Sequence, residues 1–286
     1  MVALSLAPGR LLEAHIDEVA ADLRNGRLVP FIGPGLSALG SPAAPMTPEA
    51  LAEWLGAKVA LPRRAKGNPW AAAQHIESYK HRSTVTTLMG EAFAQPVAPT
   101  AFHHYVAGLG LPMIVDSWYA GEMRAALAGR EDWAEVQGIT RAGIGEDRWY
   151  RFYGPDGAEC SRDAAAAATT LLYTPHGSIA PARNFLISDA DYVEVLTEID
   201  IQTPIPDSVR DRRTTMGFLF IGCRFHDQML RTYARQITKR AAGPFYAIVD
   251  AAGLTRNELR FLDEEGIAMV DMPLAEAVAA LIHAKL

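Results

Sequence analysis

A glycine-rich turn follows the first apolar run of the chain. Residues 28–32 are apolar and lead directly into Gly33-Pro34-Gly35-Leu36-Ser37. Because glycine has no side chain, the two glycines let the backbone come close to a ligand. Phosphate groups favour such turns, since convergent backbone N–H groups donate hydrogen bonds to them. The turn therefore predicts a nucleotide site, with tight packing of a strand against a helix as the alternative interpretation.

Three more apolar runs end in residues that could take part in chemistry. Asp116-Ser117-Trp118-Tyr119-Ala120 follows the run at 111–115, His176-Gly177 follows the run at 171–173, and Gly222-Cys223-Arg224-Phe225-His226-Asp227 follows the run at 217–221. Parallel strands place their carboxyl ends at one edge of a sheet, where ligands bind. We therefore expect the strand ends at Gly33, Asp116, His176 and Gly222 to meet at that edge.

Alternating strand and helix patterns in the last third of the chain can position these ends. Strands are expected at 218–221, 245–249 and 267–270, and helices are expected to follow them up to 240, near 257–265 and over 274–285. Such alternation predicts an α/β fold with a doubly wound, mostly parallel Rossmann-like sheet. At the other end of the chain, apolar residues at helical spacing predict a helix over 11–25.

Two inner segments depart from this alternation. Thr47 followed by Pro48 is typical of a helix start, and further helices are expected over 67–94 and 100–109. Together these helices predict a small inserted helical module at about 44–110. The region at about 129–168 is the least regular. Within it, aromatic residues followed by Gly-Pro-Asp-Gly predict a β-hairpin, and an alanine run predicts a short helix.

Together, the four strand ends resemble the SIR2-like family, the NAD-binding relatives of sirtuins found in bacterial proteins. That family has a strand followed by Gly-Ala-Gly-x-Ser, then Thr-Thr-Asn-Tyr-Asp, then His-Gly, and then Phe-Ile-Gly-(Tyr)-Ser-x-x-Asp. The order and spacing match from about Leu23 to about Met272. The resemblance implies that residues 1–286 form a single SIR2-like domain whose ligand is NAD or an ADP-ribose-type nucleotide.

The resemblance also implies roles for the matching residues. The glycine turn would contact the NAD pyrophosphate, and the segment after Gly222 would contact the adenosine half. His176 would act as the base toward a ribose hydroxyl, because imidazole exchanges protons near neutral pH; a hydrogen-bonded structural histidine is the alternative. The residues expected to bind the cofactor are Gly33, Pro34, Gly35, Ser37, Trp118, Gly222, Cys223 and Asp227.

Departures from the family pattern at Pro34, Trp118 and Ala120 weaken the expected chemistry. Pro34 replaces an alanine and lacks the backbone N–H, so the turn loses one hydrogen-bond donor. Trp118 replaces the asparagine that is catalytically important near the nicotinamide ribose, and Ala120 replaces an aspartate; neither side chain can do the work of the one it replaces. Asp116 or Ser117 could substitute only with a different strand end. We therefore expect weak or no cleavage of NAD.

Composition limits the remaining classes. The chain has 286 residues, 49% of them hydrophobic, and a formal net charge of −6, which gives no general attraction to nucleic acid. It has neither an apolar run long enough for a bilayer nor a basic start with a long apolar segment, so we expect a cytoplasmic protein. Its two cysteines, Cys160 and Cys223, cannot supply the four thiolates of a sirtuin zinc ribbon, and the histidines show no metal-ligand spacing.

Three hypotheses about function therefore stand. The first is a sensor that binds NAD or an ADP-ribose-type nucleotide with little turnover. The second is an active NAD glycohydrolase that uses His176, as in family members of bacterial anti-phage systems. The third is a ligand-free module that binds a protein partner or a second copy of itself. Protein deacylation is a weaker variant of the second hypothesis, because the zinc module that helps to shape the acyl-lysine groove is missing.

Overall fold

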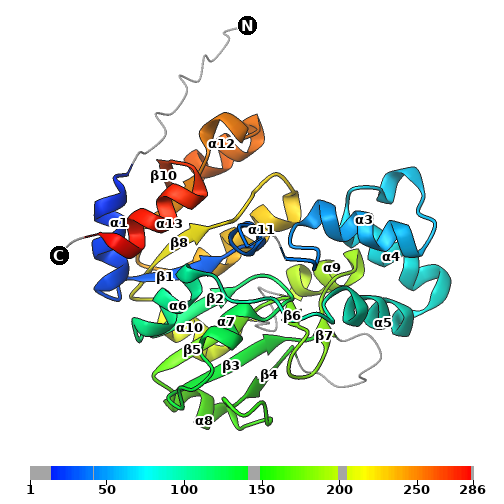
Figure 1. Ribbon diagram of the computed structural model, residues 1–286, viewed down its shortest axis with the longest axis horizontal. Helices are drawn as coiled ribbons and strands as arrows, with labels where there is room; N and C mark the ends of the chain where they lie inside the picture. The colour runs from blue at the N-terminus through cyan, green and yellow to red at the C-terminus, as the bar shows by residue number, and fades with distance from the viewer. Residues whose placement is uncertain (1–13, 41, 141–148, 199–204, 285–286) are drawn as a thin grey trace, which may run out of the picture.

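The computed structural model describes residues 14–40, 42–140, 149–198 and 205–284 (Figure 1). In these residues, eight strands form one sheet in the order β10-β9-β8-β1-β2-β5-β3-β4, and all neighbours are parallel except β3 and β4. The prediction of a mostly parallel α/β sheet is confirmed. The strands are β1 (Leu28–Ile32), β2 (Met113–Asp116), β3 (Trp133–Gly138), β4 (Tyr150–Tyr153), β5 (Thr170–Thr174), β8 (Gly217–Ile221), β9 (Phe245–Val249) and β10 (Ala268–Asp271).

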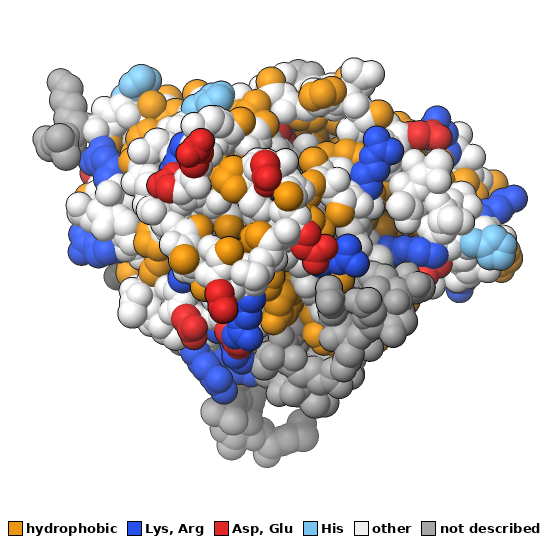
Figure 2. All heavy atoms as spheres, turned by 90° about the horizontal axis from the view of Figure 1, so that it is seen from below, with side chains coloured by type: hydrophobic (Ala, Val, Ile, Leu, Met, Phe, Trp, Pro, Cys, Tyr) orange, Lys and Arg blue, Asp and Glu red, His pale blue; other side chains and the backbone are white. Residues whose placement is uncertain are grey.

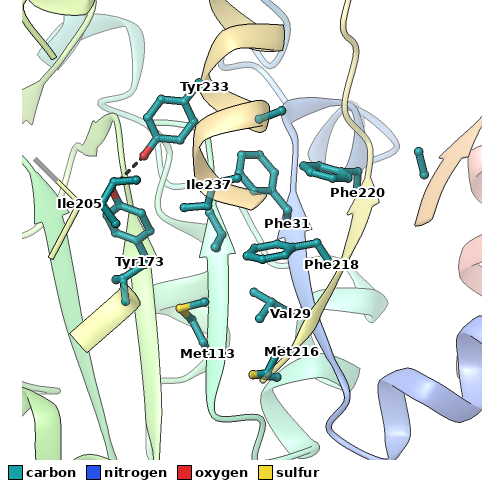
Figure 3. Close-up of a cluster of buried hydrophobic side chains, with 14 of the residues drawn as sticks. Val29, Phe31, Met113, Tyr173, Ile205, Met216, Phe218, Phe220, Tyr233 and Ile237 are labelled. Carbon is teal, nitrogen blue, oxygen red and sulfur yellow. Dashed lines mark hydrogen bonds between the residues drawn. The ribbon is translucent and has the colours of Figure 1, made fainter. Parts of the chain in front are cut away.

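Helices cover both faces of the sheet because its central strands bury side chains on both sides. Val29 and Phe31 of β1 point to one face, where they meet Phe218 and Phe220 of β8 (Figure 3). Leu28 of β1 belongs to the core on the opposite face. The first face packs on α8 (Arg162–Ala167), α10 (Asp207–Arg213), α11 (Gln228–Thr238) and α12 (Arg256–Glu264), and the second on α1 (Ile16–Arg24), α6 (Ala101–Gly108), α7 (Glu122–Ala126) and α13 (Leu274–His283).

A separate cluster of helices lies to one side of the sheet (Figure 1). It contains α3 (Pro48–Lys58), α4 (Pro69–Lys80) and α5 (Arg82–Ala92), which share a core with Tyr192 of α9 (Asp189–Glu198). The predicted start of α3 is confirmed, since the Thr47 hydroxyl accepts a hydrogen bond from the Ala50 N–H at 3.1 Å. We call α3, α4 and α5 the helical module; α6, also within the predicted insert, packs on the sheet.

The region predicted to be least regular supplies two strands of the sheet: β4, which was predicted as the aromatic strand of the hairpin, and β3, which was not predicted. β3 is buried along its whole length and pairs with β5 on one side and β4 on the other. This strand was not predicted because polar residues interrupt its hydrophobic pattern. One of them, Glu135, is fully buried and binds Arg124 and Gln137. The predicted hairpin turn forms after β4, where Tyr153 bridges to Glu159, although residues 141–148 lie outside the described part.

Other segments differ from the predictions in detail. A short helix, α2 (Pro34–Ala38), begins directly after Gly33, where a glycine-rich turn was expected. Strands β6 (Gly177–Ser178) and β7 (Asn184–Phe185) form a small antiparallel pair after His176. Among the described helices, none has the length and apolar character needed to cross a membrane. On the face seen in Figure 2, acidic and basic side chains are interspersed among hydrophobic ones.

Candidate functional site

A cavity of about 520 Å³ lies between the carboxyl ends of the strands and the helical module. This volume is typical of small-molecule and cofactor sites. Pro34 and Gly35, Ser117, His176, and Gly222 all line it, so the prediction that the four strand ends meet is confirmed. Aromatic side chains form much of the wall: Phe31, Trp70, Trp118, Tyr119, Tyr192, Phe225 and Tyr233.

The glycines at one side of this cavity bring two backbone turns into direct contact. The Gly33 N–H donates to the Ile221 carbonyl at 2.8 Å, and the Gly35 N–H donates to the Gly222 carbonyl at 2.9 Å. A Cβ atom on Gly33 would lie 2.4 Å from the Gly222 oxygen, and one on Gly222, where φ is +67°, would lie 2.4 Å from the Leu36 nitrogen. We call Gly33, Gly35 and Gly222 the glycine contact. It already uses the N–H groups of Gly33 and Gly35.

The end of β2 is held by hydrogen bonds on both sides. The buried Asp116 carboxylate accepts from the Trp118 N–H at 3.2 Å and from the Met123 N–H at 3.4 Å, and it does not line the cavity. Burial, together with nearby Glu122, raises the pKa of Asp116 well above its usual value. Ser117 does line the cavity, and its hydroxyl donates to the Ile32 carbonyl at 2.8 Å.

Trp118 joins this strand end to the helical module. Its indole N–H donates to the Pro45 carbonyl at 3.1 Å, and its ring packs edge-on against Phe93 with the centroids 6.3 Å apart. The ring also forms part of the cavity wall. Trp118 therefore presents an apolar face where the family pattern has an amide, because its one polar group is already bound elsewhere.

His176 is buried in the aromatic wall. Its Nδ1 lies 3.1 Å from the Tyr192 hydroxyl, and its ring centroid lies 4.9 Å from that of Tyr233. The Tyr192 hydroxyl in turn lies 3.4 Å from that of Tyr119, which donates to the Leu186 carbonyl. Burial lowers the pKa of His176 to about 3. The imidazole is therefore neutral at physiological pH, fixed in orientation, and a weak proton acceptor.

A second hollow, of about 220 Å³, adjoins the cavity across the glycine contact. The two share Gly35, Gly222, Cys223 and Arg224 in their linings, and the second hollow extends to Asp250 after β9. The Arg224 guanidinium binds the carboxylate of Glu258 with two hydrogen bonds, of 2.9 and 3.0 Å. The sequence analysis assigned no role to Arg224 or Asp250, although Arg224 stands three residues after β8 and Asp250 directly follows β9, at the sheet edge where ligands bind.

Comparison with known families agrees with this arrangement. The family model of the SIR2-like domain matches residues 112–270, which is more than half of the chain. The chain belongs to the SIR2-like family. Within this SIR2-like domain, the match runs from the start of β2 into β10 and includes Trp118, His176 and Gly222, whereas the glycine turn and the helical module precede it. No curated protein matches the chain closely enough to count as a relative.

The remaining predicted site residues of the SIR2-like domain lie in different places. Pro34 occupies the first position of α2, where a missing N–H is tolerated, and it lines the cavity. Ser37 is buried beside Glu122, outside the lining. Cys223 lines the cavity, but its thiol donates to the Phe31 carbonyl at 3.4 Å and burial raises its pKa, so it stays a neutral thiol. Asp227 precedes α11 and does not line the cavity.

Within the described residues, His, Cys, Asp and Glu side chains do not gather in groups of three or more that could hold a metal ion. Both cysteines are free thiols. The family as a whole suggests an NAD-related function.

Proposed function

We propose that this SIR2-like domain binds NAD or an ADP-ribose-type nucleotide and cleaves it slowly or not at all. One observation carries the proposal: two hollows adjoin at the glycine contact and share Arg224. A dinucleotide has the matching shape, since two nucleoside halves are joined by a diphosphate. The cavity on the His176 side takes the nicotinamide ribose of NAD or the terminal ribose of ADP-ribose. The second hollow takes the adenosine.

The second hollow supports this orientation through Asp250. Its carboxylate follows β9 at the sheet edge and accepts a hydrogen bond from the Ala252 N–H at 3.1 Å, which fixes its position. An acidic residue at such a place accepts hydrogen bonds from ribose hydroxyls in dinucleotide-binding folds. The diphosphate then lies over Gly35 and Gly222, where side chains are absent.

Slow turnover follows from the reacting end of the cavity. Trp118 offers an apolar ring there, and Ala120 has no polar group to orient the nicotinamide ribose. His176 is a weak base because burial lowers its pKa to about 3. The alternative of an active NAD glycohydrolase is favoured by one observation, namely that the His176 ring does line the cavity.

The five tryptophans provide a test on the wild-type protein, in which substitutions serve only to assign the signals. We expect NAD and ADP-ribose, added to ¹⁵N-labelled protein, to shift the indole N–H signals of Trp70 and Trp118, which line the cavity. The signal of Trp133, buried in the sheet core, should stay in place and serves as the internal control. Assignment comes from single Trp→Phe variants.

A mass-spectrometric time course with NAD separates the hypotheses. Shifts of Trp70 and Trp118 without release of nicotinamide support a binding protein. Rapid nicotinamide release that disappears in His176→Ala would establish the glycohydrolase instead. If neither nucleotide shifts any indole signal, the nucleotide site is wrong and the ligand-free interaction module is favoured.

A further inference from the structure

Arg224 occupies the junction between the two hollows. It lines both of them, and it is the one Lys or Arg among the described residues in either lining. In the family pattern this position is a serine. A serine offers a hydroxyl, whereas arginine offers a permanent positive charge and several N–H donors in a plane. The chain therefore has a cation at the point where a diphosphate would pass.

The guanidinium is held in one orientation by a buried acid. Nε and one terminal nitrogen, Nη2, bind the two carboxylate oxygens of Glu258, and Nη2 also donates to the Gly253 carbonyl at 3.0 Å. Glu258 is fully buried, and it also accepts hydrogen bonds from the Phe225 and Thr255 N–H groups. Among the described residues, the other terminal nitrogen of Arg224, Nη1, has no hydrogen-bond partner, and the side chain is 49% exposed.

The backbone of the glycine turn has few donors left for an anion. Pro34 has no N–H, and the N–H groups of Gly33 and Gly35 are used in the glycine contact. The Leu36 N–H donates to the Gly33 carbonyl at 3.2 Å. A turn of this sequence is expected to bind phosphate through such groups, so the binding of two phosphate charges here requires another source of positive charge.

We propose that Arg224 supplies this charge: held by Glu258, it binds the diphosphate through Nη1 and makes the site select diphosphate-bearing nucleotides over nucleosides. This inference rests on the proposed nucleotide-binding function. An arginine fixed by a buried carboxylate has already lost side-chain freedom, so little further ordering opposes binding.

The test compares the affinities of ADP-ribose and adenosine by calorimetry in three variants. In Arg224→Gln we expect ADP-ribose to bind roughly 10- to 100-fold more weakly, because one charge-assisted hydrogen bond is lost. The affinity for adenosine should change less than about threefold. Arg224→Lys keeps the charge but not the planar fork, so it should recover part of the ADP-ribose affinity. Arg256→Gln removes an exposed arginine that lines neither hollow and should change nothing.

Salt dependence provides a second readout that does not rely on any variant. The ADP-ribose affinity of the wild type should fall as KCl rises, and the adenosine affinity should not. Unchanged ADP-ribose affinity in Arg224→Gln, or equal losses for both ligands, overturns the role of Arg224 while the nucleotide site stands. Should Arg224→Gln fail to fold, Arg224→Lys and the salt series decide the question. If the wild type binds neither ligand, both this inference and the proposed function fail.

Discussion

The two ends of the candidate site differ in what burial does to charge. At one end, His176 is surrounded by tyrosines, and burial lowers its pKa to about 3, so it is neutral. At the other end, burial alone would raise the pKa of Glu258, but hydrogen bonds from Arg224 and from two backbone N–H groups outweigh it and lower the pKa to about 2. Burial with enough partners preserves a charge, and burial without them removes it.

This difference matches the division between binding and catalysis that we propose. A fixed charge at the Arg224 end suits an anionic ligand, because it needs no proton exchange. A proton acceptor at the other end must instead change charge during the reaction, which the aromatic wall around His176 opposes. Three experiments test this division and the packing beneath it.

The largest effect is expected at the glycine contact, which both ends share. Gly222→Val would place a side chain against the backbone of Leu36 at a residue with φ of +67°. We expect a loss of at least about 5 kcal/mol in the free energy of unfolding, enough to prevent folding of most domains. Gly90→Val in α5 is the control, since a Cβ there meets open space, and it should cost less than about 1 kcal/mol.

Urea unfolding of the soluble variants, or the soluble yield where a variant does not fold, measures this prediction. A Gly222→Val protein as stable as the wild type would show that the two turns separate readily. The glycines would then be free to serve a ligand alone, and the contact described above would have little energetic weight.

The sequence predicted the fold well wherever apolar runs were uninterrupted. The limits of β9 were predicted correctly, and α3 was predicted from the N-cap at Thr47 and the proline that follows. β3 was missed because Glu135 and Gln137 are polar but buried; Glu135 binds Arg124, and the Gln137 amide donates to Glu135. A pattern based on hydrophobicity cannot anticipate such partners, since they come from other elements.

The candidate site was predictable to a similar extent. His176, Gly35 and Gly222 lie at strand ends, could be found from motifs and line the cavity, whereas Gly33 does not line it. Tyr192 and Tyr233 were missed because α9 and α11 reach the cavity only through tertiary packing. Tyr233 points toward Tyr173 (Figure 3), and their hydroxyls lie 2.8 Å apart. The partnership of Arg224 with Glu258 spans 34 residues and leaves no local pattern.

The second prediction concerns turnover at the Trp118 end. Trp118→Asn removes a ring that packs on Phe93 and binds Pro45, so we expect it to cost roughly 3 to 5 kcal/mol of stability. Combined with Ala120→Asp, it restores the family pattern and should raise nicotinamide release per folded molecule. Trp118→Phe is the matched control, because it keeps an aromatic ring without any polar group.

Turnover is measured by mass spectrometry at a temperature at which circular dichroism shows that each variant is folded. Equal rates in the restored variant and in Trp118→Phe would mean that the asparagine position does not limit cleavage in this chain. A wild type that already cleaves NAD quickly would contradict the proposal directly.

The smallest effect tests the neutral state of His176 through pH. Its pKa is about 3 in the folded protein, below the usual 6.5, so the unfolded chain takes up a proton at a higher pH than the folded one. Stability is therefore lost as pH falls through 6.5 toward 3, by about 2 kcal/mol between pH 7 and pH 5. His176→Gln removes this component, so urea unfolding of the variant should depend less on pH by that amount. His283→Gln, at an exposed histidine of α13, should follow the wild type. If His176 titrates near neutral pH by NMR, the imidazole is a competent proton acceptor and the glycohydrolase becomes the better account of this end of the site.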